Sequence, residues 1–195
     1  MRAFGRVLGS LLRAGDLVML TGPLGAGKTT MTQGIAEGMD VTGRVASPTF
    51  VIAQVHHPRL GAGADLVHVD AYRLESLEEL DALDLDTSLE ESATVVEWGE
   101  GKVEVLADDR LTITITRPSG MALDDEASEL SPDAPRTLQL SATGARARQI
   151  IEQIRTLIPG ADGVRTVSED AMSGGDYPDE PKPSGADSFR SERGN

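Results

Sequence analysis

Cysteine is absent from this chain of 195 residues, so neither a disulfide framework nor a thiolate metal site is possible. The three histidines, His56, His57 and His68, have no spacing that would hold zinc. Long apolar runs are also missing: no stretch approaches the roughly 18 unbroken apolar residues of a membrane span, and the N-terminus lacks the apolar segment of a signal peptide. We therefore expect a soluble, cytoplasmic protein with no membrane partner.

Basic residues are few. The chain has 18 Lys and Arg residues against 32 Asp and Glu residues, which gives a formal net charge of −14. A protein that grips a nucleic-acid backbone unaided needs Lys and Arg to displace counterions. The composition therefore predicts no DNA binding, and it predicts that any contact with RNA passes through a partner protein.

Apolar residues recur with helical or strand spacing through most of the chain. The segments with strand patterns are 16–21, 51–55, 66–69, 94–96, 111–116 and 136–140, and those with helical spacing are 4–12, 31–39 and 148–158. The last two strands alternate apolar and polar residues, so we expect them to pair with each other. This order predicts an α/β protein with a mixed sheet and antiparallel C-terminal strands.

A phosphate loop follows the first predicted strand and opens a helix. Residues 22–29 match Gly-x-x-x-x-Gly-Lys-Ser/Thr at every fixed position. Its glycines let backbone amides surround an anion at the positive end of the new helix, while Lys28 would span the β- and γ-phosphates and Thr29 would bind Mg²⁺. ATP and Mg²⁺ are the expected cofactors. The predicted nucleotide-binding residues are Gly22, Pro23, Leu24, Gly25, Ala26, Gly27, Lys28, Thr29 and Thr30.

Two acids follow predicted buried strands. Asp70 ends one strand and Glu97 ends the next, so in a parallel sheet both would emerge at the edge that carries the phosphate loop. One could hold the metal while the other positions water for catalysis. For either acid alone, a turn cap or an ion pair is an equally good interpretation.

Two further residues are candidates by position. Thr49 follows Pro48, after the phosphate-loop helix, where a hydroxyl can sense the γ-phosphate; an ordinary turn hydroxyl explains it as well. Trp98 directly follows Glu97 and is either a core residue or part of a partner-facing surface, and we favour the core.

Four segments occur in a characteristic order: the phosphate loop, then Ser-Pro-Thr-Phe at 47–50, His-Val-Asp-Ala-Tyr-Arg-Leu at 68–74, and Val-Glu-Trp-Gly-Glu at 96–100. Together they resemble the TsaE family of bacterial P-loop ATPases over residues 4–158. The resemblance implies an ATPase that is weak alone and acts with TsaB and TsaD to form threonylcarbamoyladenosine next to the anticodon of tRNAs that read ANN codons. TsaE would then meet tRNA only indirectly.

The resemblance also implies roles for individual residues. Thr29 and Glu97 match the Mg²⁺ ligands of the family, and Asp70 matches the acid placed for hydrolysis. Segment 47–50, with Thr49, matches a switch-like segment. Trp98 matches a tryptophan that the family needs for activity.

The expected architecture is a three-layer P-loop NTPase-like domain over residues 1–158. Residues 118–135 are rich in acids and lack periodicity, which predicts a flexible acidic insertion, and 159–195 are expected to form a disordered acidic tail.

Two other functions are also compatible with the phosphate loop. A small-molecule kinase would transfer the γ-phosphate to an acceptor, although no arginine-rich lid is evident, and a non-hydrolysing switch would bind ATP without turnover.

Overall fold

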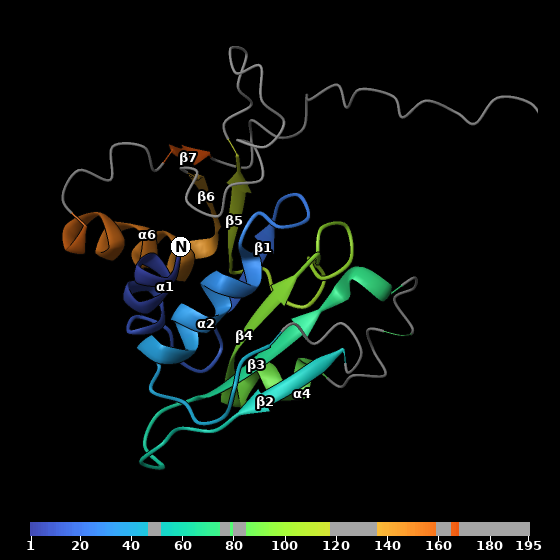
Figure 1. Ribbon diagram of the computed structural model, residues 1–195, viewed down its shortest axis with the longest axis vertical. Coiled ribbons are helices and arrows are strands. Elements are labelled where there is room, and N and C mark those ends of the chain that lie inside the picture. The colour runs from blue at the N-terminus through green and yellow to red at the C-terminus, as the bar shows by residue number, and fades with distance from the viewer. Residues whose placement is uncertain (47–51, 75–78, 80–84, 118–135, 159–164, 168–195) are drawn as a thin grey trace, which may run out of the picture.

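A seven-stranded sheet forms the centre of the computed structural model, which describes residues 1–46, 52–74, 79, 85–117, 136–158 and 165–167 (Figure 1). The strands are β1 (Leu17–Thr21), β2 (Ala53–His56), β3 (Asp65–Asp70), β4 (Ser92–Glu97), β5 (Arg110–Thr116), β6 (Thr137–Thr143) and β7 (Arg165–Val167). The helices are α1 (Arg2–Gly9), α2 (Lys28–Gly38), the short 3₁₀ helix η1 (Ala71–Arg73), α4 (Leu85–Glu91) and α6 (Gly144–Leu157).

The sheet is mixed, as the sequence predicted. Its strand order is β2-β3-β4-β1-β5-β6-β7. The four central strands are parallel, whereas β2 pairs antiparallel with β3, and β6 pairs antiparallel with β5. The carboxyl ends of the four parallel strands therefore lie along one edge, where an α/β protein binds its ligand.

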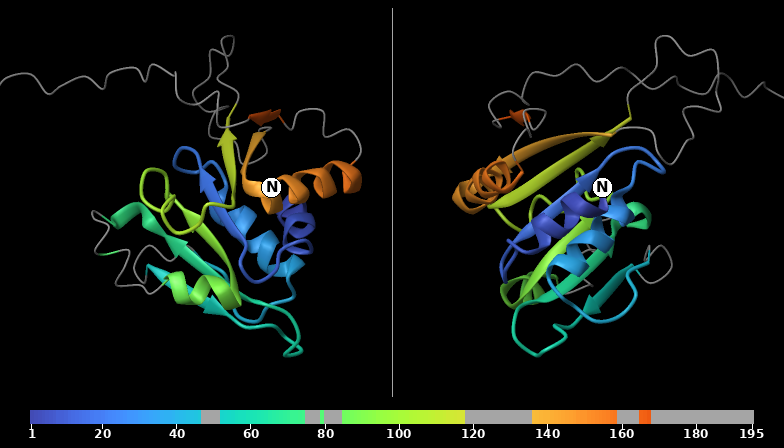
Figure 2. Two further views of the ribbon diagram at one scale, coloured as in Figure 1. Left: turned by 180° about the vertical axis from the view of Figure 1, so that it is seen from behind. Right: turned by 60° about the vertical axis from the view of Figure 1, so that its left-hand side comes forward.

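Both faces of the central strands are covered, which makes three layers (Figure 2). Val18 and Leu20 of β1 pack in a core with α1, α2 and α6, whereas Leu17 and Met19 belong to a second core with α4. Side chains alternate between faces along a strand, so a strand buried on both sides is apolar throughout. This explains the unbroken apolar run in β1.

Helices α1 and α2 cross at unusually close range because glycines line the contact. A Cβ added at Gly5 would collide with the Met31 carbonyl oxygen, and one added at Gly34 would collide with the Arg2 carbonyl oxygen. Gly9 and Gly38 are equally tight against the opposite helix. The crossing holds α1 directly against the helix that begins at the phosphate loop.

A buried ion pair ties α6 to the start of β1. The guanidinium of Arg146 donates from Nε to Asp16 Oδ1 at 2.9 Å and from Nη2 to Asp16 Oδ2 at 2.8 Å. Asp109 accepts hydrogen bonds from the backbone amides of Arg146 and Ala147 in the first turn of α6, which satisfies amides that a helix N-terminus leaves without intrahelical partners.

The sequence predicted a disordered tail from residue 159; within that range the structure describes Arg165–Val167, which form β7 and pair in parallel with β6. They extend the open edge of β6, and three residues are too few to show an alternating pattern. The rest of the predicted tail, the predicted insertion at 118–135 and the segment 47–51 with Thr49 lie outside the described residues. In the part of the chain that is described, no helix is long and apolar enough to span a bilayer.

Candidate nucleotide-binding site

The loop between β1 and α2 is shaped by glycines with left-handed backbone conformations. Gly22 has φ of 132°, and a Cβ there would collide with the Ile115 carbonyl oxygen of neighbouring β5. Gly27 has φ of 110° and is the N-cap of α2. Only glycine adopts these conformations without strain. The loop therefore turns sharply enough to place the first turn of α2 at the carboxyl edge of the sheet.

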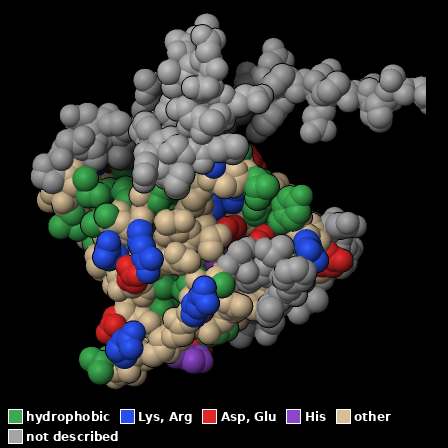
Figure 3. Space-filling model, viewed as in Figure 1, with side chains coloured by type: hydrophobic (Ala, Val, Ile, Leu, Met, Phe, Trp, Pro, Cys, Tyr) green, Lys and Arg blue, Asp and Glu red, His purple; other side chains and the backbone are tan. Residues whose placement is uncertain are grey.

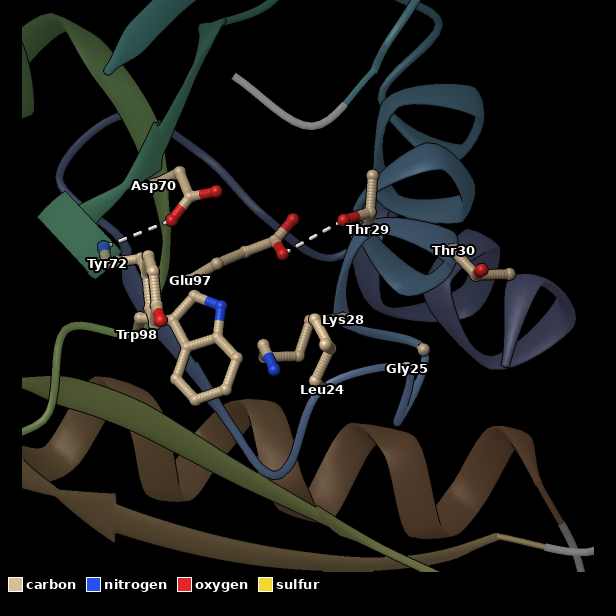
Figure 4. A pocket seen from close by; sticks show the side chains of 10 residues that line it. Leu24, Gly25, Lys28, Thr29, Thr30, Asp70, Tyr72, Glu97 and Trp98 are labelled. Atoms are coloured by element: carbon tan, nitrogen blue, oxygen red, sulfur yellow. Dashed lines mark hydrogen bonds between the residues drawn. The ribbon is translucent and has the colours of Figure 1, made fainter. Parts of the chain in front are cut away.

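A cavity of about 520 Å³ opens beside this loop (Figure 4). Its lining combines the loop, the start of α2 and the ends of two strands. The lining residues are Leu24, Gly25, Gly27, Lys28, Thr29, Thr30, Asp70, Tyr72, Glu97 and Trp98. Of the predicted nucleotide-binding residues, Gly22, Pro23 and Ala26 belong to the loop without lining the cavity.

Lys28 is folded back over the loop. Its ammonium group donates to the carbonyl oxygens of Gly22 at 2.6 Å and Pro23 at 3.1 Å. The same nitrogen lies 3.5 Å from the centre of the Trp98 ring, a cation–π contact. Burial lowers the pKa of Lys28, while the charges of Glu97 and Asp70 act in the opposite direction.

Glu97 and Asp70 lie side by side at the ends of β4 and β3, where the sequence placed them. They are register partners in the parallel pair, and both are buried. Thr29 donates from Oγ1 to Glu97 Oε2 at 3.0 Å, as Figure 4 shows. Asp70 Oδ1 instead accepts from the amide of Tyr72 at 3.1 Å and caps η1. The hydrogen bonds therefore distinguish two acids that the strand pattern alone left equivalent.

Trp98 does not lie in the core, which is the position that the sequence favoured. It is half-buried and lines the cavity, with a positive φ of 61°. Its ring is 5.4 Å from that of Tyr72, whose side chain is 64% exposed. The two rings form one wall of the cavity.

Two residues that sequence reasoning missed also belong to the site. Arg117 donates from Nη2 to the Gly25 carbonyl oxygen at 2.5 Å, and it follows β5 at the same carboxyl edge. His68, buried in β3, places Nε2 2.8 Å from Glu97 Oε1. Because side chains two residues apart in a strand share a face, the His-x-Asp spacing at 68–70 could have placed His68 on the face of Asp70, although it does not identify Glu97 as the partner of His68.

The donors at the cavity suit Mg²⁺. A hydroxyl and carboxylates are hard oxygen ligands of the kind this ion prefers, and no group of three or more acidic or histidine side chains among the described residues forms a metal site of its own. Among the described residues that line the cavity, Lys28 is the one cation against two acids. A polyphosphate entering it would need an additional positive charge, which a divalent ion would supply.

Several basic side chains elsewhere on the surface pair with acids. Arg2 and Arg6 pair with Glu37, and Arg59 pairs with Asp40. Figure 3 shows blue basic and red acidic side chains interspersed among the described residues on the face in view. That face therefore offers no broad basic surface for a nucleic acid.

The family match and the named relatives agree on one family. Residues 1–123 match the family described as threonylcarbamoyl adenosine biosynthesis protein TsaE. The tRNA threonylcarbamoyladenosine biosynthesis protein TsaE of Streptomyces coelicolor is 63% identical over 126 residues, which cover 64% of this chain and 84% of the relative. The protein of the same name from Bacillus subtilis is 34% identical over 154 residues, covering 78% and 86% of the two chains. The crystal structure of YdiB from Bacillus subtilis superimposes with a TM-score of 0.57 at 29% identity, covering 80% of this chain and 87% of YdiB.

Proposed function

Because the chain belongs to the TsaE family of threonylcarbamoyl adenosine biosynthesis proteins, we propose that it is a Mg²⁺-dependent ATPase of tRNA modification. The product would be threonylcarbamoyladenosine next to the anticodon of tRNAs that read ANN codons. The observation that supports catalysis most directly is the meeting of Lys28, Thr29 and Glu97 at one cavity.

The triphosphate of ATP would lie in the loop at residues 22–30. Amides in the first turn of α2 and the partial positive charge of its N-terminus favour an anion there. Lys28 would leave the carbonyl oxygens of Gly22 and Pro23 and bind the β- and γ-phosphates instead. The ammonium group that contacts these loop carbonyls would thus become a ligand of the nucleotide.

Thr29 and Glu97 are the residues that would hold Mg²⁺. The ion would offset the charge that develops on the phosphate oxygens during hydrolysis. Asp70, which lines the same cavity and caps η1, would orient the attacking water and accept its proton. Thr49 would sense the γ-phosphate, and departure of the phosphate after hydrolysis would change the position of segment 47–50.

We propose TsaB and TsaD as the partners, on the strength of the family. With a net charge of −14 and paired surface arginines, the chain would meet tRNA only through them. Trp98 and the exposed ring of Tyr72 stand at the cavity wall, where a bound partner could influence turnover.

Separate measurements of ATP binding and phosphate release test the assignment of the two acids. We expect Asp70→Asn to bind ATP as tightly as the parent protein and to release phosphate at least about 100-fold more slowly, as for loss of a general base. Glu97→Ala should bind ATP with an affinity that no longer depends on Mg²⁺, and it should also lose phosphate release. Phosphate release that survives both changes would refute these roles.

The same assay separates the alternative functions. A non-hydrolysing switch would bind ATP and release no phosphate even with its partners present. A small-molecule kinase would release little phosphate until an acceptor is added and would then produce a phosphorylated acceptor. Either result would exclude the proposed ATPase.

A further inference from the structure

His68 is buried in the middle of the sheet, yet it carries a polar ring. None of its surface is exposed, and it lies on the same strand face as Leu66, a residue of the core beneath α2. A polar side chain in such a position needs a hydrogen-bond partner to offset its loss of water. Its hydrogen-bond partner is Glu97, the proposed Mg²⁺ ligand.

The two oxygens of Glu97 have different surroundings. Oε1 receives hydrogen bonds from His68 Nε2 at 2.8 Å and from Thr32 Oγ1 at 3.3 Å. Oε2 lies 3.0 Å from Thr29 Oγ1. One oxygen is therefore held by groups behind the site, and the other is presented next to the hydroxyl at the cavity.

The surroundings of the two ring nitrogens of His68 indicate the role of this residue. A carboxylate only accepts hydrogen bonds, so Nε2 must carry the hydrogen that lies between His68 and Glu97. Nδ1 is buried and has no hydrogen-bond partner among the described residues. Burying a polar ring is unfavourable without compensating hydrogen bonds, so packing alone would favour an aliphatic residue at this fully buried position. The contact with Glu97 accounts for the histidine.

We infer that His68 is a positioning residue for the Mg²⁺ site: it fixes Oε1 of Glu97, so that Oε2 stays directed toward the cavity beside Thr29. The inference rests on the proposed function, because it requires Mg²⁺ to bind at Glu97. Hydrogen-bond partners behind a metal ligand orient that ligand, and their loss typically lowers metal affinity about 10- to 100-fold.

The test measures the affinity for ATP by calorimetry twice, once with EDTA and once with Mg²⁺. The dissociation constant in EDTA divided by the dissociation constant in Mg²⁺ gives the contribution of the metal to ATP affinity, and it does not depend on catalysis. We expect His68→Leu to reduce this ratio about 10-fold or more while binding ATP in EDTA normally. His68→Gln, whose amide can donate from near the position of Nε2, should retain most of the ratio. His56→Leu is the matched control, because it removes another buried histidine that lies on β2, outside the cavity lining.

A folded His68→Leu protein with the parental ratio would overturn the inference and leave the proposed function intact. If His68→Leu does not fold, His68→Gln and His68→Asn decide, because the shorter Asn amide cannot reach Glu97 as Nε2 does; equal ratios for these two variants would overturn the inference. A parent protein whose ATP affinity does not respond to Mg²⁺ would instead refute the proposed function, and the inference with it.

Discussion

The ammonium nitrogen of Lys28 lies 3.5 Å from the centre of the Trp98 ring. The same ammonium group donates to two carbonyl oxygens of its own loop, those of Gly22 and Pro23. A lysine that binds phosphates must leave these partners, so the environment of the ring depends on whether the loop is occupied. Trp98 is the sole tryptophan of the chain, which makes this dependence measurable.

We predict that saturating Mg²⁺ and ATP change the fluorescence emission of Trp98, because Lys28 moves from the ring to the phosphates. The measurement is a titration of emission against ATP, with binding determined in parallel by calorimetry. Lys28→Met should show no such change. An unchanged emission in parent protein that has bound ATP would contradict the predicted movement of Lys28.

Because glycines line the crossing of α1 and α2, we predict that adding one methyl group there lowers the stability of the protein substantially. Gly34→Ala places a Cβ against the Arg2 carbonyl oxygen, and overpacking of this kind typically costs about 1–3 kcal/mol. We expect a lower free energy of unfolding, measured in urea. Ser10→Ala, at the exposed end of α1, should change it by less than about 0.5 kcal/mol. Equal stabilities for the two variants would show that the helices can separate at no cost.

The burial of His56 leads us to predict that the free energy of unfolding decreases in mild acid. Burial lowers its pKa from the ordinary value of 6.5, against an opposing hydrogen bond to the Thr42 carbonyl oxygen. The unfolded chain therefore takes up a proton at higher pH than the folded one. Stability is fully present above pH 6.5 and falls as the pH drops through 6.5 toward the lowered pKa.

The check is the melting temperature of the parent protein and of His56→Leu, measured across this range. We expect the decrease on acidification to be smaller in the variant, because the variant has no imidazole to protonate at this position. A parent protein and a variant whose melting temperatures fall in parallel would show that His56 does not contribute to the pH dependence.

Local patterns were enough to predict much of the fold. The apolar run before the glycine loop predicted β1, and the alternation at 111–116 and 136–140 predicted the antiparallel pair β5 and β6. The positions of Asp70 and Glu97 followed from the rule that parallel strands end at one edge of a sheet.

The contacts within the site could not be predicted, because they depend on which strands are neighbours and in which register. His68 meets Glu97 only because β3 and β4 pair in parallel with residues 68 and 95 opposite each other. Arg117 meets Gly25 because β5 lies next to β1. The core was favoured for Trp98 over a partner-facing surface because tryptophans are usually buried, but the backbone turn at the end of β4 directs it to the cavity.

The measurement that tests the central claim most directly is ATP hydrolysis by the purified chain, alone and with TsaB and TsaD from the same organism. The account predicts slow phosphate release by the chain alone, faster release with both partners, and none above background for Lys28→Ala under either condition. Release by Lys28→Ala at the parental rate, or ATP hydrolysis that the partners leave unchanged, would contradict it.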